Sequence, residues 1–300
     1  MDTLMSLLSK APSTDWVAPK RDLRRVDVIL IAVQPVELRA VRATFQRDGV
    51  DGGEGRKFDE FKWTNPRSAC CHEIDCVITA TEGPGNVDAA VAIAEIAQHY
   101  SASLWVLLGM SAGVDEETVP IGTVVLPQMA WYYEPGRQWN NKIEPRPELE
   151  QRRDPVQTAL FYFEADSGTM PILKQRFAKV IEDIQTAEGF DAAPPKTPPV
   201  QFGHRVVASG EKQLRDGQIL KDLHEKDQNI VIADMESYGF AHACRHANWL
   251  IARGVSDYCI EKEKQYQYAA TCFAAETVRA LMESPYLPPL LERHRNHGAF

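Results

Sequence analysis

Long apolar runs are missing from this sequence of 300 residues. No stretch reaches the roughly 18 to 20 consecutive apolar residues that a membrane-spanning helix needs. Near the start, the apolar patch of Leu4, Met5, Leu7 and Leu8 is too short, and too close to Asp2, to serve as a secretory signal. We therefore expect a cytoplasmic protein with no membrane partner.

Cysteine pairs with the spacing of metal sites are also missing. The six cysteines include no two Cys-x-x-Cys units, which excludes the common structural zinc sites. Cys76, Cys244 and Cys272 fall within apolar segments, where a free thiol packs as a small hydrophobic side chain. We expect a reduced compartment, no bound metal and no cofactor.

An excess of positive charge is missing as well. The formal net charge is -9 at pH 7, which argues against a general affinity for nucleic acid or for anionic membranes. If the ligand carries phosphate, the basic side chains that bind it must be gathered at one place. The composition therefore argues against a nucleic-acid partner.

The sequence has no internal repeat, and strand-like segments alternate with helix-like segments along it. Apolar runs rich in β-branched residues predict strands, and apolar residues at helical spacing predict helices. The predicted strands are 26–33, 104–108, 121–126, 206–209, 230–233 and 249–253, with a hairpin of 57–63 and 71–81; the predicted helices begin at Pro35 and cover 87–100, 172–184, 235–246 and 266–282. In the helix of 87–100, we place Val87, Val91, Ala94 and Ala97 on one apolar face. This alternation predicts an α/β fold with a central mixed sheet flanked by helices.

Composition along the chain predicts the domain boundaries. We place an N-terminal arm at 1–25, one domain at 26–284 and a C-terminal tail at 285–300. Within the domain, residues of about 131–201 are irregular and rich in proline, and we interpret them as an insertion, because long ordered loops are usually functional.

Acidic side chains follow two of the predicted strands. Asp234 and Glu236 come directly after 230–233, and Asp257 comes after 249–253. The crevice at the carboxyl ends of strands is where open α/β sheets bind ligands. Asp234 is assigned to capping the next helix, but capping does not explain why both strands end in acids. We therefore expect Glu236 and Asp257 to bind sugar or to act as a general acid.

Six short motifs occur in one order along residues 26 to 283. They are Glu37 after the first strand, Gly83-Pro84-Gly85-Asn86, Gly109-Met110-Ser111-Ala112-Gly113, Ala208-Ser209-Gly210-Glu211, Asp234-Met235-Glu236 and Ser256-Asp257. This ordered set resembles the nucleoside phosphorylase and nucleosidase superfamily, which includes the methylthioadenosine and adenosylhomocysteine nucleosidases. The resemblance implies a single nucleoside-phosphorylase-like domain.

The resemblance also implies roles for individual residues. Cleavage of a purine N-glycosidic bond needs a proton for the leaving base, support for an oxocarbenium-like sugar and an activated nucleophile. Asp257 matches the family acid at the purine N7, and Glu37 matches the carboxylate that activates water. Glu236 matches the residue that holds the ribose hydroxyls, with Met235 packed under the sugar.

The residue after Gly109 bears on the choice of nucleophile. Phosphorylases and related nucleosidases usually carry Ser or Thr directly after this glycine, whereas the ungapped match here gives Met110. Ser111 would take that place if the loop register shifts by one residue. We assign Gly109, Met110 and Ser111 to substrate binding and expect water rather than phosphate to attack.

More specifically, the sequence resembles the purine nucleotide nucleosidases that serve as bacterial antiphage effectors and cleave adenine from ATP. The matching residues are Gln34-Pro35-Val36-Glu37, Tyr133 with Gly136-Arg137, Pro145-Arg146-Pro147, Ser209-Gly210-Glu211-Lys212, Ser256-Asp257-Tyr258 and the run from Lys262 to Ala270. Because Arg and Lys bind phosphate groups, we assign Arg137, Arg146, Lys212 and Lys262 to the triphosphate. Leu214 is assigned to the same substrate pocket.

The resemblance thus implies an enzyme that hydrolyses ATP or dATP to adenine and a ribose triphosphate, in defence against phage, as a homo-oligomer. One alternative is a purine nucleoside phosphorylase or a nucleosidase that acts on unphosphorylated nucleosides. Another is a catalytically silent nucleotide sensor that binds a partner through residues 1–25. The presence of Glu37, Glu236 and Asp257 weighs against a silent protein.

Overall fold

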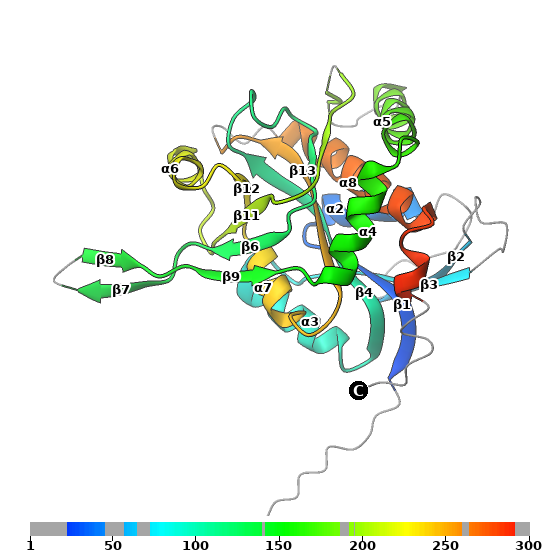
Figure 1. Cartoon of the computed structure of the whole chain (residues 1–300), viewed down its shortest axis with the longest axis horizontal. Coiled ribbons are helices and arrows are strands. Elements are labelled where there is room, and N and C mark those ends of the chain that lie inside the picture. The colour runs from blue at the N-terminus through cyan, green and yellow to red at the C-terminus, as the bar shows by residue number, and fades with distance from the viewer. Residues whose placement is uncertain are drawn as a thin grey trace, which may run out of the picture.

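A mixed β-sheet with helices on both faces forms the body of the protein in the computed structural model (Figure 1). The structure describes residues 23–45, 57–64, 73–139, 142–186, 192–194, 196–259 and 264–291. The predicted fold class is confirmed. Most of the predicted N-terminal arm, residues 1–22, lies outside the described residues.

The centre of the sheet consists of parallel strands. β3 (Glu73–Ala80), β1 (Arg24–Ala32), β4 (Tyr100–Gly113) and β13 (Trp249–Asp257) pair in that order. Both faces of β1 are covered: Val28 and Leu30 belong to one core cluster, and Ile29 and Ile31 belong to the other. This two-sided burial explains the continuous apolar run in the sequence. The predicted hairpin is confirmed, since β2 (Asp59–Thr64) is antiparallel to β3.

The length of β4 lets it pair with three strands. Its first part lies between β1 and β13, and its end pairs with β12 (Ile230–Asp234) in the antiparallel direction. β11 (Val206–Ser209), β6 (Met129–Tyr132) and β9 (Glu148–Gln151) continue from β12, and the short β5 (Val124–Val125) and β10 (Val200–Gln201) extend beyond β13. The ends of β1, β4, β12 and β13 therefore meet at one place.

Two groups of helices cover the sheet. α2 (Pro35–Phe45), α4 (Asp154–Ala165), α5 (Thr169–Thr186) and α8 (Gln267–Glu283) contribute to one core cluster. α3 (Asn86–Ile96), α6 (Gln218–Lys226) and α7 (Ser237–Ala243) contribute to the other. α8 lies directly on β13: a Cβ at Gly254 would come within 2.0 Å of the Ala270 carbonyl oxygen. No helix within the described ranges is long and apolar enough to cross a membrane.

The face of α3 that carries Val87, Val91, Ala94 and Ala97 is exposed. Val87 and Val91 are 66% and 60% exposed, whereas Ala89 and Ile93 are buried. The helix packs on the sheet through the other face, which carries Ile93 and Ile96.

The region of 131–201 adds several elements to the fold. β7 (Gly136–Trp139) and β8 (Lys142–Pro145) form a separate two-stranded hairpin that projects from the body (Figure 1). β9 joins the main sheet, and α4 and α5 pack against its face. Past the predicted end of the domain at 284, Leu287, Leu290 and Leu291 are still buried in the core.

Some predicted element boundaries differ from the structure. The helix predicted at 235–246 covers only Ser237–Ala243, and the strand predicted at 121–126 is reduced to Val124–Val125. α4 and α6 were not predicted. These segments are set by tertiary contacts more than by local pattern, which is the usual reason that propensity fails.

Candidate active site

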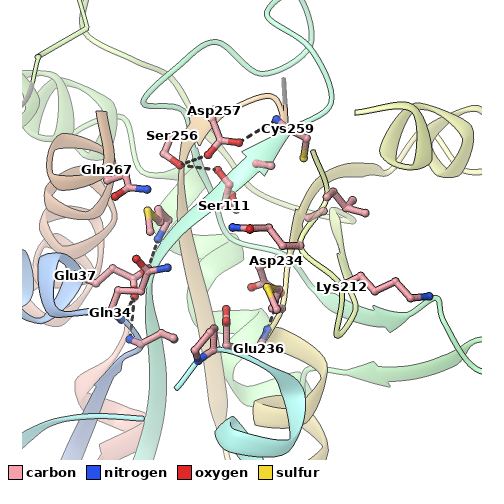
Figure 2. Close-up of a pocket in the computed structure, with 18 residues that line it drawn as sticks. Gln34, Glu37, Ser111, Lys212, Asp234, Glu236, Ser256, Asp257, Cys259 and Gln267 are labelled. Atoms are coloured by element: carbon pink, nitrogen blue, oxygen red, sulfur yellow. Dashed lines mark hydrogen bonds between the residues drawn. The ribbon is translucent and has the colours of Figure 1, made fainter. Parts of the chain in front are cut away.

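One cavity lies where β1, β4, β12 and β13 end (Figure 2). It is lined by residues from these strand ends, from the turn before α3, from the segment after β11 and from the start of α8. The lining residues are Val33, Gln34, Glu37, Pro84, Met110, Ser111, Ala112, Lys212, Gln213, Leu214, Ala233, Asp234, Met235, Glu236, Ser256, Asp257, Cys259 and Gln267. The structure thus brings together most of the site residues predicted from the sequence, whose roles stay predictions.

Glu37 is fixed at the junction of β1, α2 and β4. Its Oε2 accepts hydrogen bonds from the backbone N–H groups of Gln34 at 2.7 Å and Val33 at 2.9 Å. Its Oε1 accepts a hydrogen bond from the Met110 N–H at 2.8 Å. The side chain is buried, and these donors hold the carboxylate in one orientation at the cavity wall.

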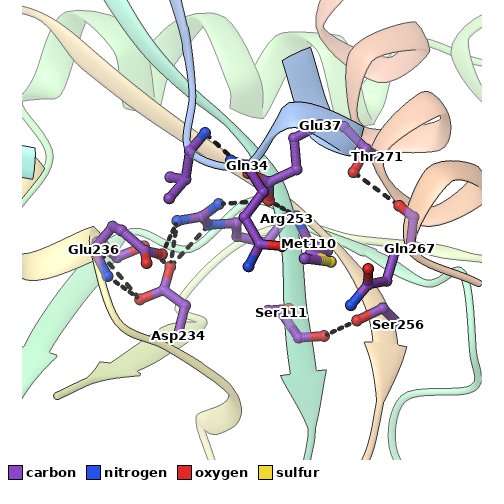
Figure 3. Close-up of polar contacts among 12 residues, drawn as sticks. Gln34, Glu37, Met110, Ser111, Asp234, Glu236, Arg253, Ser256, Gln267 and Thr271 are labelled. Atoms are coloured by element: carbon purple, nitrogen blue, oxygen red, sulfur yellow. Dashed lines mark hydrogen bonds and ion pairs between the residues drawn. The ribbon is translucent and has the colours of Figure 1, made fainter. Parts of the chain in front are cut away.

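Arg253 is a site residue that the sequence analysis missed. It is fully buried, and its guanidinium lies 2.8 Å from Asp234, 3.0 Å from Glu236 and 3.7 Å from Glu37 (Figure 3). The signal was present in the sequence, since a lone arginine inside the apolar strand of β13 is tolerated only when it is paired. We call these four residues the Arg253 wall.

Burial of the Arg253 wall changes the proton affinity of its groups. Burial raises the pKa of Glu236 to about 8, helped by the charges of Asp234 and Glu37 and opposed by Arg253. Burial alone would lower the pKa of Arg253, but the three carboxylates outweigh it and raise that pKa above its ordinary value. Arg253 therefore stays charged, and Glu236 keeps its proton to a higher pH than an ordinary carboxyl group does.

The close approach of Glu37 and Arg253 to β4 depends on Gly109. A Cβ at this position would come within 2.1 Å of Glu37 Oε1 and 2.4 Å of Arg253 Nη1. No side chain fits there without moving one of the two charged groups. Gly109, which was assigned to substrate binding, does not line the cavity, and its lack of a side chain makes room for Glu37 and Arg253.

Asp257 lies at the end of β13, where two backbone irregularities flank it. The pairing register with β4 shifts between Val255 and Asp257, so that Ser256 forms a bulge, a feature that redirects side chains near active sites. The carboxylate accepts hydrogen bonds from the Ser256 hydroxyl and the Cys259 N–H, both at 2.9 Å. Cys259 has a φ of 62°, in the left-handed region. We call Ser256, Asp257 and Cys259 the Asp257 wall.

Asp234 does more than cap a helix. Its Oδ1 accepts the N–H groups of Glu236 at 3.3 Å and Ser237 at 3.0 Å, which confirms the expected cap-like contacts at the start of α7. Its Oδ2 also binds Arg253. The assignment to capping alone was wrong, because the sequence did not show that Arg253 points at this carboxylate.

Met110 and Ser111 both line the cavity, but they contribute different groups. Met110 supplies the backbone N–H that binds Glu37. The Ser111 hydroxyl is buried and has no hydrogen-bond partner within the part of the chain that the structure describes. A buried hydroxyl without a partner on a cavity wall is suited to a ligand.

The cations assigned to the triphosphate are distributed unevenly. Lys212 lines the cavity with Leu214, but its side chain is 79% exposed and its amine extends away from the other labelled residues in Figure 2. Arg137 and Arg146 are exposed residues at the β7–β8 hairpin and do not line the cavity. Lys262 lies outside the described residues.

Metal ligation has no candidate in the described ranges, where no three His, Cys, Asp or Glu side chains are grouped for it. The cavity does combine a fixed carboxylate at Glu37, a carboxyl group of raised pKa at Glu236 and a hydrogen-bonded carboxylate at Asp257. Such a set can bind hydroxyl groups, orient water and exchange protons with a ligand.

Comparisons with known proteins add three similarities. The ATP nucleosidase Cap17 of Escherichia coli (strain KTE188) is 23% identical over 265 residues, which make up 86% of this chain and 51% of that protein, so the chain spans about half the length of this relative. The 5'-methylthioadenosine/S-adenosylhomocysteine nucleosidase of Neisseria meningitidis superimposes with a TM-score of 0.55 at 18% identity over 87% of this chain and 99% of its own. The futalosine hydrolase of Helicobacter pylori superimposes with a TM-score of 0.56 at 11% sequence identity, over 87% of this chain and 98% of its own.

The two solved structures establish a shared fold at these levels of identity. The family rests on a separate comparison with a protein-family model. The matched residues include both walls of the cavity and nearly all of the sheet. With residues 28–283 matched to the model described as the phosphorylase superfamily, this chain belongs to the phosphorylase superfamily.

Proposed function

We propose that this chain is a nucleosidase that hydrolyses the N-glycosidic bond of a purine nucleotide, ATP or dATP, and releases adenine and a ribose triphosphate. The observation that carries the proposal is the convergence of Glu37, Glu236 and Asp257 on one cavity. Glycosidic cleavage uses carboxyl groups on opposite sides of the scissile bond.

Each carboxyl group takes one part of the reaction. Asp257 donates a proton or hydrogen bond to the departing purine, since it is half-buried in the cavity wall at the end of β13 and its orientation is fixed. Glu236 accepts hydrogen bonds from the ribose hydroxyls. Glu37 orients the attacking water and accepts its proton, with the buried charge of Arg253 nearby to balance the developing charges.

Hydrolysis is favoured over phosphorolysis by the charges around the cavity. Among the described residues that line it, Lys212 is the only Lys or Arg. Arg253 already faces three carboxylates. A phosphate ion needs cationic or N–H donors that are not already neutralised, so water is the better nucleophile here.

The choice of ATP rests on similarity and on Lys212. The named relative is an ATP nucleosidase, and the antiphage role follows the sequence resemblance stated above. Because Arg137 and Arg146 do not line the cavity of a single chain, their contact with a triphosphate requires a second copy of the chain. A homo-oligomer therefore remains part of the proposal.

The test is to incubate the purified chain with ATP, AMP and adenosine, with and without phosphate, and to identify the products by mass. Adenine released from ATP without phosphate is the expected result. Ribose 1-phosphate that forms only when phosphate is present would instead identify a phosphorylase. Binding of ATP without any product would favour the silent sensor.

A further inference from the structure

Two glutamine side chains face the cavity without partners in the described structure. Gln267, at the first position of α8, is 9% exposed and lines the cavity, and Figure 3 places its side chain beside Met110 and Ser256. Gln34, at the end of β1, is half-buried and lies next to Glu37 (Figure 2). Their backbones are hydrogen-bonded, to Thr271 and Glu37 respectively. We call Gln34 and Gln267 the glutamine wall.

An amide group that faces a cavity and has no protein partner is suited to a polar ligand, because a bound ligand shields the amide from water. Nearly all buried polar groups in native proteins are hydrogen-bonded, and an unmade bond costs more than an average bond contributes. The Ser111 hydroxyl, which is buried and has no partner among the described residues, lines the same cavity. An amide group without a hydrogen-bond partner on a cavity wall therefore predicts a ligand atom that donates or accepts a hydrogen bond.

The Arg253 wall and the Asp257 wall limit which part of the ligand can lie beside the glutamine wall. A nucleoside presents three groups from its sugar: the base, the edge with the 2′ and 3′ hydroxyls, and the C5′ substituent. In the proposed reaction the base lies at Asp257 and the hydroxyl edge at Glu236. The atom bonded to C5′ is therefore assigned to the glutamine wall, and the extended Lys212 amine is left for the outer phosphates of a triphosphate.

We propose that Gln34 and Gln267 recognise the 5′ substituent and select substrates with an oxygen at that position, as a hydroxyl or a phosphate ester, over substrates with a 5′-thioether. The assignment rests on the proposed function of the same site. An oxygen atom forms hydrogen bonds with the amide groups, whereas a bound alkylthio group would cover them without forming any. A site that is built to form a hydrogen bond rejects an analogue that lacks it.

The test compares the wild-type chain with Gln267→Met, Gln34→Met and the double variant. Methionine keeps the length of the side chain and removes the amide. The substrates are ATP, adenosine and 5′-methylthioadenosine, and the measured quantity is the ratio of kcat/KM for each 5′-oxygen substrate to that for the thioether. Gln98→Met, at an exposed position, is the matched control.

We expect each substitution to lower this ratio about tenfold, as the loss of one hydrogen bond predicts, and the double variant to lower it more. Comparing ATP with adenosine distinguishes a phosphate oxygen from a hydroxyl oxygen as the recognised group. Thermal unfolding of each variant shows whether the change is confined to substrate selection. A ratio that stays within twofold of wild type in the double variant overturns the assignment.

Failure of the proposed function gives a different result. A wild-type chain that releases no base from any of the three compounds contradicts the nucleosidase proposal. The glutamine assignment is then tested by calorimetry alone, as the ratio of Kd for adenosine to Kd for 5′-methylthioadenosine in the same variants. If that ratio is also unchanged by the double substitution, the glutamine assignment falls too.

Discussion

On the Arg253 wall, three carboxylates share one fully buried guanidinium, whereas on the Asp257 wall a single carboxylate is held by a hydroxyl and a backbone N–H. The first arrangement couples the fold to the site, because removal of the buried guanidinium would leave buried acidic side chains without a counter-charge. The second orients one side chain by local backbone geometry. Damage to the two walls should therefore have different consequences.

The largest effect is expected for Arg253→Met. Removal of the guanidinium leaves Asp234, Glu236 and Glu37 buried without a counter-charge, which costs about 3 to 5 kcal/mol when one partner of a buried pair is lost. Chemical denaturation should show this loss of stability together with a loss of turnover. Unchanged stability would mean that the wall does not couple fold and site. The exposed Arg245→Met is a matched control.

Asp257→Asn should separate turnover from stability. The amide oxygen can still accept the Cys259 N–H, so we expect the unfolding midpoint to change little. Loss of the acid should lower kcat by about 10² to 10⁴, the usual contribution of general acid catalysis, while nucleotide still binds. An unimpaired kcat in a steady-state assay would remove Asp257 from the proposed mechanism.

The stability of the protein should depend on pH through Glu236. Its pKa rises from 4.5 in the unfolded chain to about 8 in the folded protein, so between these values the folded state binds the extra proton. Stability therefore falls as pH increases through this window, by up to about 1.4 kcal/mol per pH unit for one proton. Denaturation at several pH values measures the slope. Glu236→Gln should flatten it, and a slope that persists would have to come from another group.

The smallest effect is expected for Lys212→Met. The amine is 3.9 Å from Glu134 and largely exposed, so the stability of the fold should not change measurably. If Lys212 contacts phosphate, KM for ATP should increase at most about fivefold, the range of an exposed ion pair, and less at high salt. Lys221→Met, on the exposed side of α6, is the control. A KM that is independent of salt and of Lys212 would exclude this lysine from substrate binding.

The sequence predicted the strand ends well, and with them the residues that meet in the cavity. Glu37 and Asp257 follow β1 and β13, which are parallel to β4, so the carboxyl ends of these strands meet. Glu236 follows β12, which pairs with the end of β4 in the antiparallel direction, an arrangement that the sequence did not show. Arg253 was missed as a site residue because local pattern places it inside a strand and does not show which residues it faces. The same limit applies to α3, where alanines on both sides left the buried face undecided.

The positions of Arg137 and Arg146 show another limit of sequence motifs. Both lie in motifs that resemble nucleotide-cleaving relatives, yet their hairpin projects from the body (Figure 1), and neither residue lines the cavity. A motif match therefore does not show where its residues lie relative to the site.

The lack of a side chain at Gly109 also limits which substitutions this protein can accept during evolution. A single methyl group there would overlap both Glu37 and Arg253, so a mutation at this position is harmful unless those charged residues change as well. The three positions are therefore constrained to vary together. Homologues that replace this glycine should also have lost the arginine or the glutamate, and with them the chemistry of this wall.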